Sequence, residues 1–198
     1  MTAVRRICGI PVTLLIAVVA QVAIINRLPL PGDAGPDVVL LAVTAIGAMF
    51  GPMTGTIVGF CGGLALDVAP PSGHLAGEYA LVFCLAGYAC GRMRNLLDPL
   101  REHGTLTSMT VMMVGAAGGE AAKAALGLML SDPDMTGPAI RQVLPAAIVY
   151  NLLFSPFVLW LVVLAVGRPA RPSAVSPHRT APRTAPQYGA VRLATAGS

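Results

Sequence analysis

Glu120 and Lys123 are the most informative charged residues of the sequence, because they lie well inside the otherwise apolar stretch 105–130. A spacing of three residues places both side chains on one face of a helix, where opposite charges can pair. If that helix crosses a membrane, the pair faces the protein interior or a cavity, since exposing it to lipid is costly. We therefore predict an intramembrane charge pair. This pair either fixes helix packing or belongs to a proton or substrate relay. A relay normally needs further titratable groups along its path. The apolar stretches 7–25, 38–50 and 143–166 contain no Asp, Glu, Lys or His.

A second polar group consists of Asp67, His74 and Glu78, which we expect near the outer face of the membrane. These side chains can converge to bind a cation or a small polar ligand. Alternatively, they are helix-end and loop residues that simply meet water. Both interpretations remain open at the level of the sequence.

Motifs of membrane enzymes and pumps are missing from the sequence. It contains no His-Glu-x-x-His, no Gly-x-x-x-x-Gly-Lys-Ser/Thr loop, no Gly-x-Ser-x-Gly elbow and no Cys-x-x-Cys pair. The cysteines fall inside or at the edges of apolar stretches, which favours buried small side chains over a disulfide or zinc site: Cys8, Cys61, Cys84 and Cys90. We predict a protein that is not an enzyme and has no catalytic residue, cofactor or metal.

The composition is that of a polytopic membrane protein. Of the 198 residues, 55% are hydrophobic and only 11% are charged, and the mean hydropathy is +0.73. The net charge of +4 comes from arginines that flank apolar stretches or lie near the C-terminus. Membrane orientation explains this charge better than binding to nucleic acid does.

The chain is organised around a glycine ridge, in which every fourth residue is Gly51, Gly55, Gly59 or Gly63, and Asp67 follows at the same spacing. On a helix these positions share one slowly winding face. Glycine is a poor helix former in water, but between lipids it permits close approach of a second helix. We predict that this face is a helix-packing surface or a partner interface.

We predict an all-α fold of six transmembrane helices, two of them short, near residues 7–25, 38–50, 53–68, 75–91, 105–130 and 143–166. Two topologies are possible for 38–68: two short, tilted or re-entrant helices that meet at Gly51-Pro52, or one long helix that is kinked there. Separate helices leave only Arg27 and Arg141 outside, which the positive-inside rule favours. Both termini are then cytoplasmic.

Two regions follow from this pattern. Residues 1–166 form the predicted six-helix membrane domain. Residues 167–198 are rich in Arg and Pro and contain no acidic residue. We predict that they form a disordered cytoplasmic tail.

The ordered residues of 36–91 resemble the rod shape-determining protein family MreD. The residues that carry this resemblance are Pro36-Asp37-Val38-Val39-Leu40-Leu41, Gly51-Pro52, Gly55, Gly59-Phe60, Gly63-Leu64, Asp67, Gly77-Glu78-Tyr79-Ala80-Leu81, Gly87-Tyr88 and Gly91. The likeness extends over about 1–166 in hydropathy. Glu120 and Lys123 do not map onto the family pattern.

The resemblance implies a non-catalytic membrane scaffold of the bacterial cell-elongation machinery, in the cytoplasmic (inner) membrane. Its implied partners are an MreC-like protein, a RodA-type glycosyltransferase with its penicillin-binding transpeptidase and, indirectly, the MreB cytoskeleton. The family is similar in architecture to the substrate-binding subunits of energy-coupling-factor transporters. The alternative function is therefore a substrate-binding subunit of a vitamin-type membrane transporter.

Overall fold

The computed structural model describes residues 2–28, 35–69, 77–97, 104–130 and 137–167. These residues form α-helices joined by short connections, with one short 3-10 helix and no strand among them. The helices are α1 (Thr2–Ala23), α2 (Val38–Phe50), α3 (Pro52–Val68), α4 (Glu78–Leu97), α5 (Gly104–Met129) and α6 (Gly137–Val166), and the 3-10 helix η1 is Ile25–Arg27. The all-α prediction is confirmed. His74 and all of the predicted tail 167–198 except Gly167 lie outside the described residues.

Three of the described helices are long and apolar enough to cross a membrane: Ile7–Arg27, Leu106–Met129 and Val143–Val166. Helices α2 and α3 are apolar but shorter. Helix α4 continues to Leu97, so its last turns, from Arg92 onward, lie beyond the expected end of its apolar stretch near residue 91. The structure therefore contains long helices of membrane character together with shorter ones.

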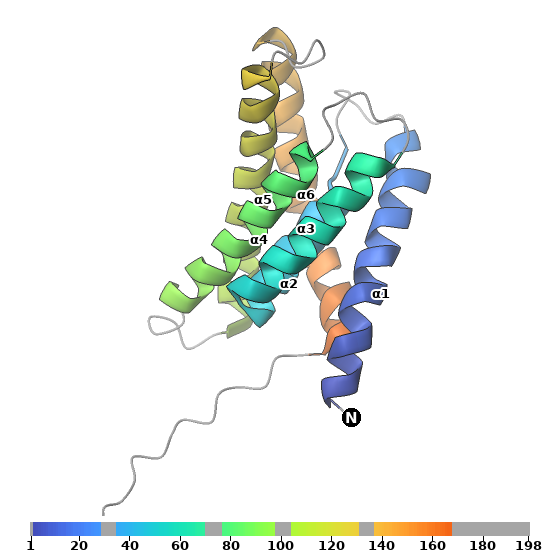
Figure 1. Cartoon of the computed structure of the whole chain (residues 1–198). Coiled ribbons are helices and arrows are strands. Elements are labelled where there is room, and N and C mark those ends of the chain that lie inside the picture. The colour runs from blue at the N-terminus through green and yellow to red at the C-terminus, as the bar shows by residue number, and fades with distance from the viewer. Residues whose placement is uncertain (1, 29–34, 70–76, 98–103, 131–136, 168–198) are drawn as a thin grey trace, which may run out of the picture.

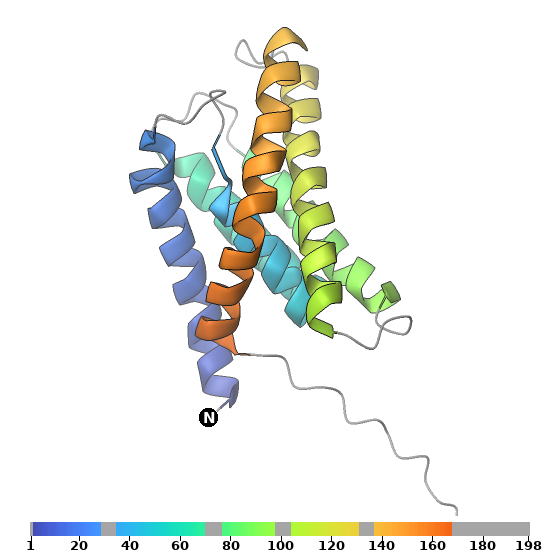
Figure 2. The same ribbon diagram turned by 180° about the vertical axis from the view of Figure 1, so that it is seen from behind.

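Helix α2 is the centre of the bundle. Its residues from Val39 to Met49 are all buried, on every side of the helix. A helix that is apolar all round is stable only when other helices surround it, and α1, α3, α4, α5 and α6 all pack against it. Figures 1 and 2 show α2 enclosed between α3 and α4 on one side and α6 on the other.

The Gly51-Pro52 junction separates two antiparallel helices, and there is no single kinked helix. Gly51 has φ +95°, a conformation that favours glycine, and it ends α2. Pro52 then occupies the first turn of α3, where its missing N–H costs nothing. The chain reverses within this dipeptide, so α3 packs back along α2.

Arginine side chains close two helix ends at the same end of the bundle. The Arg5 guanidinium donates to the carbonyl oxygens of Leu164 and Ala165 at the end of α6. Arg94 Nη1 donates to the carbonyl oxygens of Ala48 and Met49 near the end of α2, at 2.6 and 2.9 Å. The N-terminus and the end of α6 accordingly lie together (Figure 1).

Candidate functional site

Helix α2 begins inside the bundle and not at its edge. Asp37 occupies its N-cap position, and the Asp37 backbone N–H donates to Oδ1 of Asn151 at 2.7 Å. Asn151 lies midway along α6 and is 1% exposed. The first turn of α2 is therefore held at about half the depth of the longest helix.

A helix start leaves backbone N–H groups without a partner, and inside a membrane each unsatisfied group costs several kcal/mol. At the start of α2, side chains accept hydrogen bonds from these backbone N–H groups. Besides the bond to Asn151, the Val38 N–H donates to Gln21 Oε1 at 2.9 Å and the Leu40 N–H donates to Asp37 Oδ1 at 2.9 Å. Gln21 is steadied in turn by Asn26, whose Oδ1 lies 3.1 Å from Gln21 Nε2. Polar residues from α1, α2, α6 and the η1 turn thus stabilise an interior helix end.

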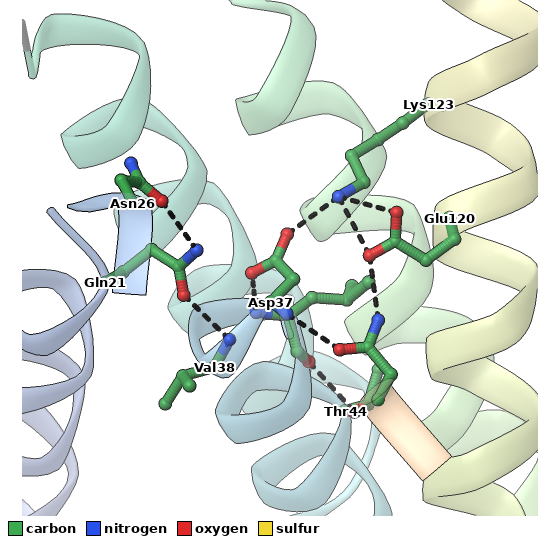
Figure 3. A network of polar contacts seen from close by, with 9 residues as sticks. Gln21, Asn26, Asp37, Val38, Thr44, Glu120 and Lys123 are labelled. Carbon is green, nitrogen blue, oxygen red and sulfur yellow. Dashed lines mark hydrogen bonds and ion pairs between the residues drawn. The ribbon is translucent and has the colours of Figure 1, made fainter. Parts of the chain in front are cut away.

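Lys123 joins two carboxylates at this point, as Figure 3 shows. Its Nζ lies 2.8 Å from Asp37 Oδ2 and 2.9 Å from Glu120 Oε2. Asp37 is 6% and Glu120 is 7% exposed. Asn151 completes the connection, because its Nδ2 donates to Glu120 Oε1 at 2.8 Å. We refer to Gln21, Asp37, Glu120, Lys123 and Asn151 as the polar network.

Further groups balance the charges of the polar network. Its two carboxylates face a single ammonium group, and the N-terminus of α2 directs its partial positive charge at the Asp37 carboxylate. The ammonium also lies 5.6 Å from the ring centre of Tyr79 and 5.9 Å from that of Phe83, within cation–π range. The N-terminus of α2 therefore offsets part of the excess negative charge of the two carboxylates, and the two aromatic rings stabilise the Lys123 ammonium group.

This arrangement favours a packing role for the charged residues over a relay. Both oxygens of Asp37 and Oε1 of Glu120 accept hydrogen bonds, and Oε2 of Glu120 forms an ion pair with Lys123. The donors come from α2, α5 and α6, so the charges link helices distant in sequence. A buried pair of this kind is strongly destabilised when one partner is removed.

The glycine ridge faces α4 of the same chain. A Cβ atom added at Gly55, Gly59 or Gly63 would collide with the backbone of α4, at Gly87, Phe83 and Tyr79 respectively. Gly87 and Gly91 make the matching close approaches from α4, to Gly55 and to the Gly51-Pro52 junction. Gly51 itself has open space around it and serves the turn. The ridge is a contact between α3 and α4.

Asp67, which continues the ridge, is buried and caps α4. Its Oδ1 and Oδ2 accept hydrogen bonds from the backbone N–H groups of Tyr79 and Ala80, at 3.2 and 3.0 Å. Glu78 is the first residue of that helix, and His74 is outside the described residues. Among the described residues, no group of three His, Cys, Asp or Glu side chains is placed to hold a metal ion.

Two expectations need correction or completion. Only Cys90 is buried, whereas Cys8 and Cys61 are exposed on the outward faces of α1 and α3, where an apolar environment in the membrane would come from lipid.

Sequence reasoning also missed Asp37 as a member of the site. An Asp directly before an apolar run is a helix N-cap signal, but nothing local shows that this cap is buried beside Lys123.

The chain was compared with protein-family models, with curated proteins and with solved structures, and none of the three comparisons gives a match.

Proposed function

We propose that this protein is a non-catalytic membrane scaffold of the bacterial cell-elongation machinery, of the MreD type. One observation supports this proposal above the others. The residues that carry the resemblance are capping and packing residues of a single unit, α2–α3–α4. Asp37 begins α2, Asp67 caps α4, and Gly55 and Gly59 allow α3 to contact α4. Residues that cap helices and pack them into a rigid unit suit a scaffold better than an enzyme.

The proposal includes six membrane crossings with both termini in the cytoplasm. The common position of the N-terminus and the end of α6 supports it, as does the placement of Arg5, Arg92 and Arg94 towards that end. A six-helix architecture similar to energy-coupling-factor substrate-binding subunits is part of the same proposal.

The proposed partners are an MreC-like protein, a RodA-type glycosyltransferase and its penicillin-binding transpeptidase, with the MreB cytoskeleton joined indirectly. Affinity purification of the tagged protein in mild detergent tests this directly. We expect these wall-synthesis proteins to co-purify with the full chain. Their absence from a folded, monodisperse preparation would contradict the proposal.

The structure also changes which variants suit that experiment. Gly59→Leu introduces a side chain against the Phe83 backbone, so loss of partners from this variant would reflect disrupted α3–α4 packing. Phe60, the next residue, points away from the bundle and is exposed. Phe60→Ala is therefore the better probe of partner binding through α3, and the exposed Leu15 of α1 offers the matched control Leu15→Ala.

The second candidate function is a substrate-binding subunit of a small-molecule transporter. The observation that favours it is the polar network around an interior helix start, since transporters place discontinuous helices and charges at the same depth. Recovery of an ATPase module or of a bound small molecule in the same purification, in place of wall proteins, would select this function.

A further inference from the structure

The apolar thickness of the molecule differs between its two sides. The 24-residue segments of α5 and α6 that are apolar enough to cross a membrane correspond to about 36 Å of helix at about 1.5 Å per residue. Helix α3 has 17 residues, or about 25 Å. In α4 the stretch 79–91, between Glu78 and Arg92, is only about 20 Å long. A bilayer core of about 30 Å therefore fits α5 and α6 but exceeds α3 and α4.

The short side is also an outer surface. The exposed apolar residues include Leu81 and Leu85 on α4, and on α3 they include Met53, Ile57, Phe60, Leu64 and Val68. Figure 1 shows α3 and α4 side by side and inclined to α5, which reduces their extent along the direction of α5 still further. The lipid-facing band on this side is consequently narrow.

The structure prevents these helices from relieving the mismatch independently. Close glycine contacts fix α3 to α4, and Asp67 ties the end of α3 to the start of α4. Arg94 is directed towards the carbonyl oxygens of Ala48 and Met49 and is not free to extend along α4 to the interface. The mismatch between these short helices and the bilayer is then relieved by thinning of the surrounding lipid.

We propose that the α3–α4 face is a lipid-thinning surface, which binds lipids with short acyl chains and draws the two leaflets together, while the α5–α6 side accepts a bilayer of ordinary thickness. This inference depends on the membrane location of the chain and not on its proposed partners. A protein scaffold and a transporter subunit would both carry such a surface.

Tryptophan quenching by brominated lipids tests the proposal on the full chain. Trp160 is the single tryptophan, and it is exposed on α6. The matched reporter is Phe60→Trp in a Trp160→Phe background, which moves the probe to the outward face of α3. Each protein is reconstituted in mixtures of dimyristoleoyl, dioleoyl or dierucoyl phosphatidylcholine with a brominated dioleoyl analogue, and quenching reports which lipid occupies the site.

We expect the reporter on α3 to prefer the short-chain over the long-chain lipid severalfold more than Trp160 does. Equal preferences at the two positions would overturn the proposal. Absence of quenching at position 60 would overturn it as well, because protein would then cover the face. Leu85→Trp in the same background gives a second reading from α4 should the first variant fail to fold.

Discussion

At the level of single residues, Lys123 is the centre on which the polar network depends. It provides the positive charge between Asp37 and Glu120, both of which are almost fully buried. Its removal leaves two carboxylates close together without a counter-charge. The interior of a membrane protein offers little water to compensate for this loss.

We predict that Lys123→Met lowers the free energy of unfolding by about 3–5 kcal/mol, the usual cost of removing one member of a buried ion pair. Unfolding by sodium dodecyl sulfate in mixed micelles measures the change. The control is the double variant Glu120→Gln with Lys123→Met, which removes one charge of each sign and should recover part of the loss. Stability equal to that of the wild type in the single variant would contradict the assigned role.

Asn151 is the second residue of the network that can be tested alone. It accepts the backbone N–H of Asp37 and donates to Glu120, so Asn151→Leu leaves a buried N–H without a partner. We expect a loss of about 1–3 kcal/mol, the cost of one unsatisfied buried group. The same denaturation measurement applies. An exposed neighbour, Leu153→Ala, should change stability far less.

At the level of helices, the contact between α3 and α4 is decided by small residues. Backbones approach so closely at Gly59 and Gly63 that even one added carbon would collide with α4. In lipid, where the hydrophobic effect does not drive helices together, this close packing supplies much of the attraction. The stability of the pair should therefore respond to single methyl groups.

We predict opposite effects for two glycine substitutions. Gly59→Ala forces α3 away from Phe83 and should destabilise the protein, although alanine favours helix formation. Gly118, also inside a helix, has open space around it, so Gly118→Ala should stabilise the protein by up to about 1 kcal/mol. Thermal unfolding in one detergent compares the two. Equal shifts of the midpoint would show that the ridge is not tightly packed.

The start of α4 depends on a residue from another helix. Asp67 accepts two backbone N–H groups there, so Asp67→Ala should cost about 0.5–2 kcal/mol, as for other helix caps. Asp67→Asn retains one acceptor and should lose less. Thermal unfolding midpoints in detergent measure both variants. A larger loss for Asn than for Ala would argue against capping.

At the level of the whole molecule, the number of crossings sets the side of each connection. Six crossings place Leu28 and Leu130 outside and Leu96 in the cytoplasm, and all three residues are exposed. A single crossing by 38–68, which the antiparallel arrangement of α2 and α3 excludes, would leave Leu28 outside and exchange the sides of Leu96 and Leu130.

We predict that a membrane-impermeant maleimide labels Leu28→Cys and Leu130→Cys in intact cells, and labels Leu96→Cys only after permeabilisation. A background without the four native cysteines is required. Labelling of Leu96→Cys before permeabilisation would contradict six crossings.

Several features of the fold and site follow from local sequence. The apolar runs predict the helices, the spacing of Gly55, Gly59 and Gly63 predicts a smooth packing face, and the three-residue spacing of Glu120 and Lys123 places both on one face of α5. These are properties of neighbouring residues on one helix. Periodicity is sufficient to recognise them.

What only the tertiary structure decided is which distant groups meet. Periodicity shows that a glycine face exists but not that α4, with Gly87, covers it. Asp37 reads as a helix cap, yet its contact with Lys123 depends on α2 beginning halfway along α6. Such pairings join residues that are far apart in the chain. They are decided by the packing of the whole bundle, because all of its buried polar groups need hydrogen-bond partners in the same structure.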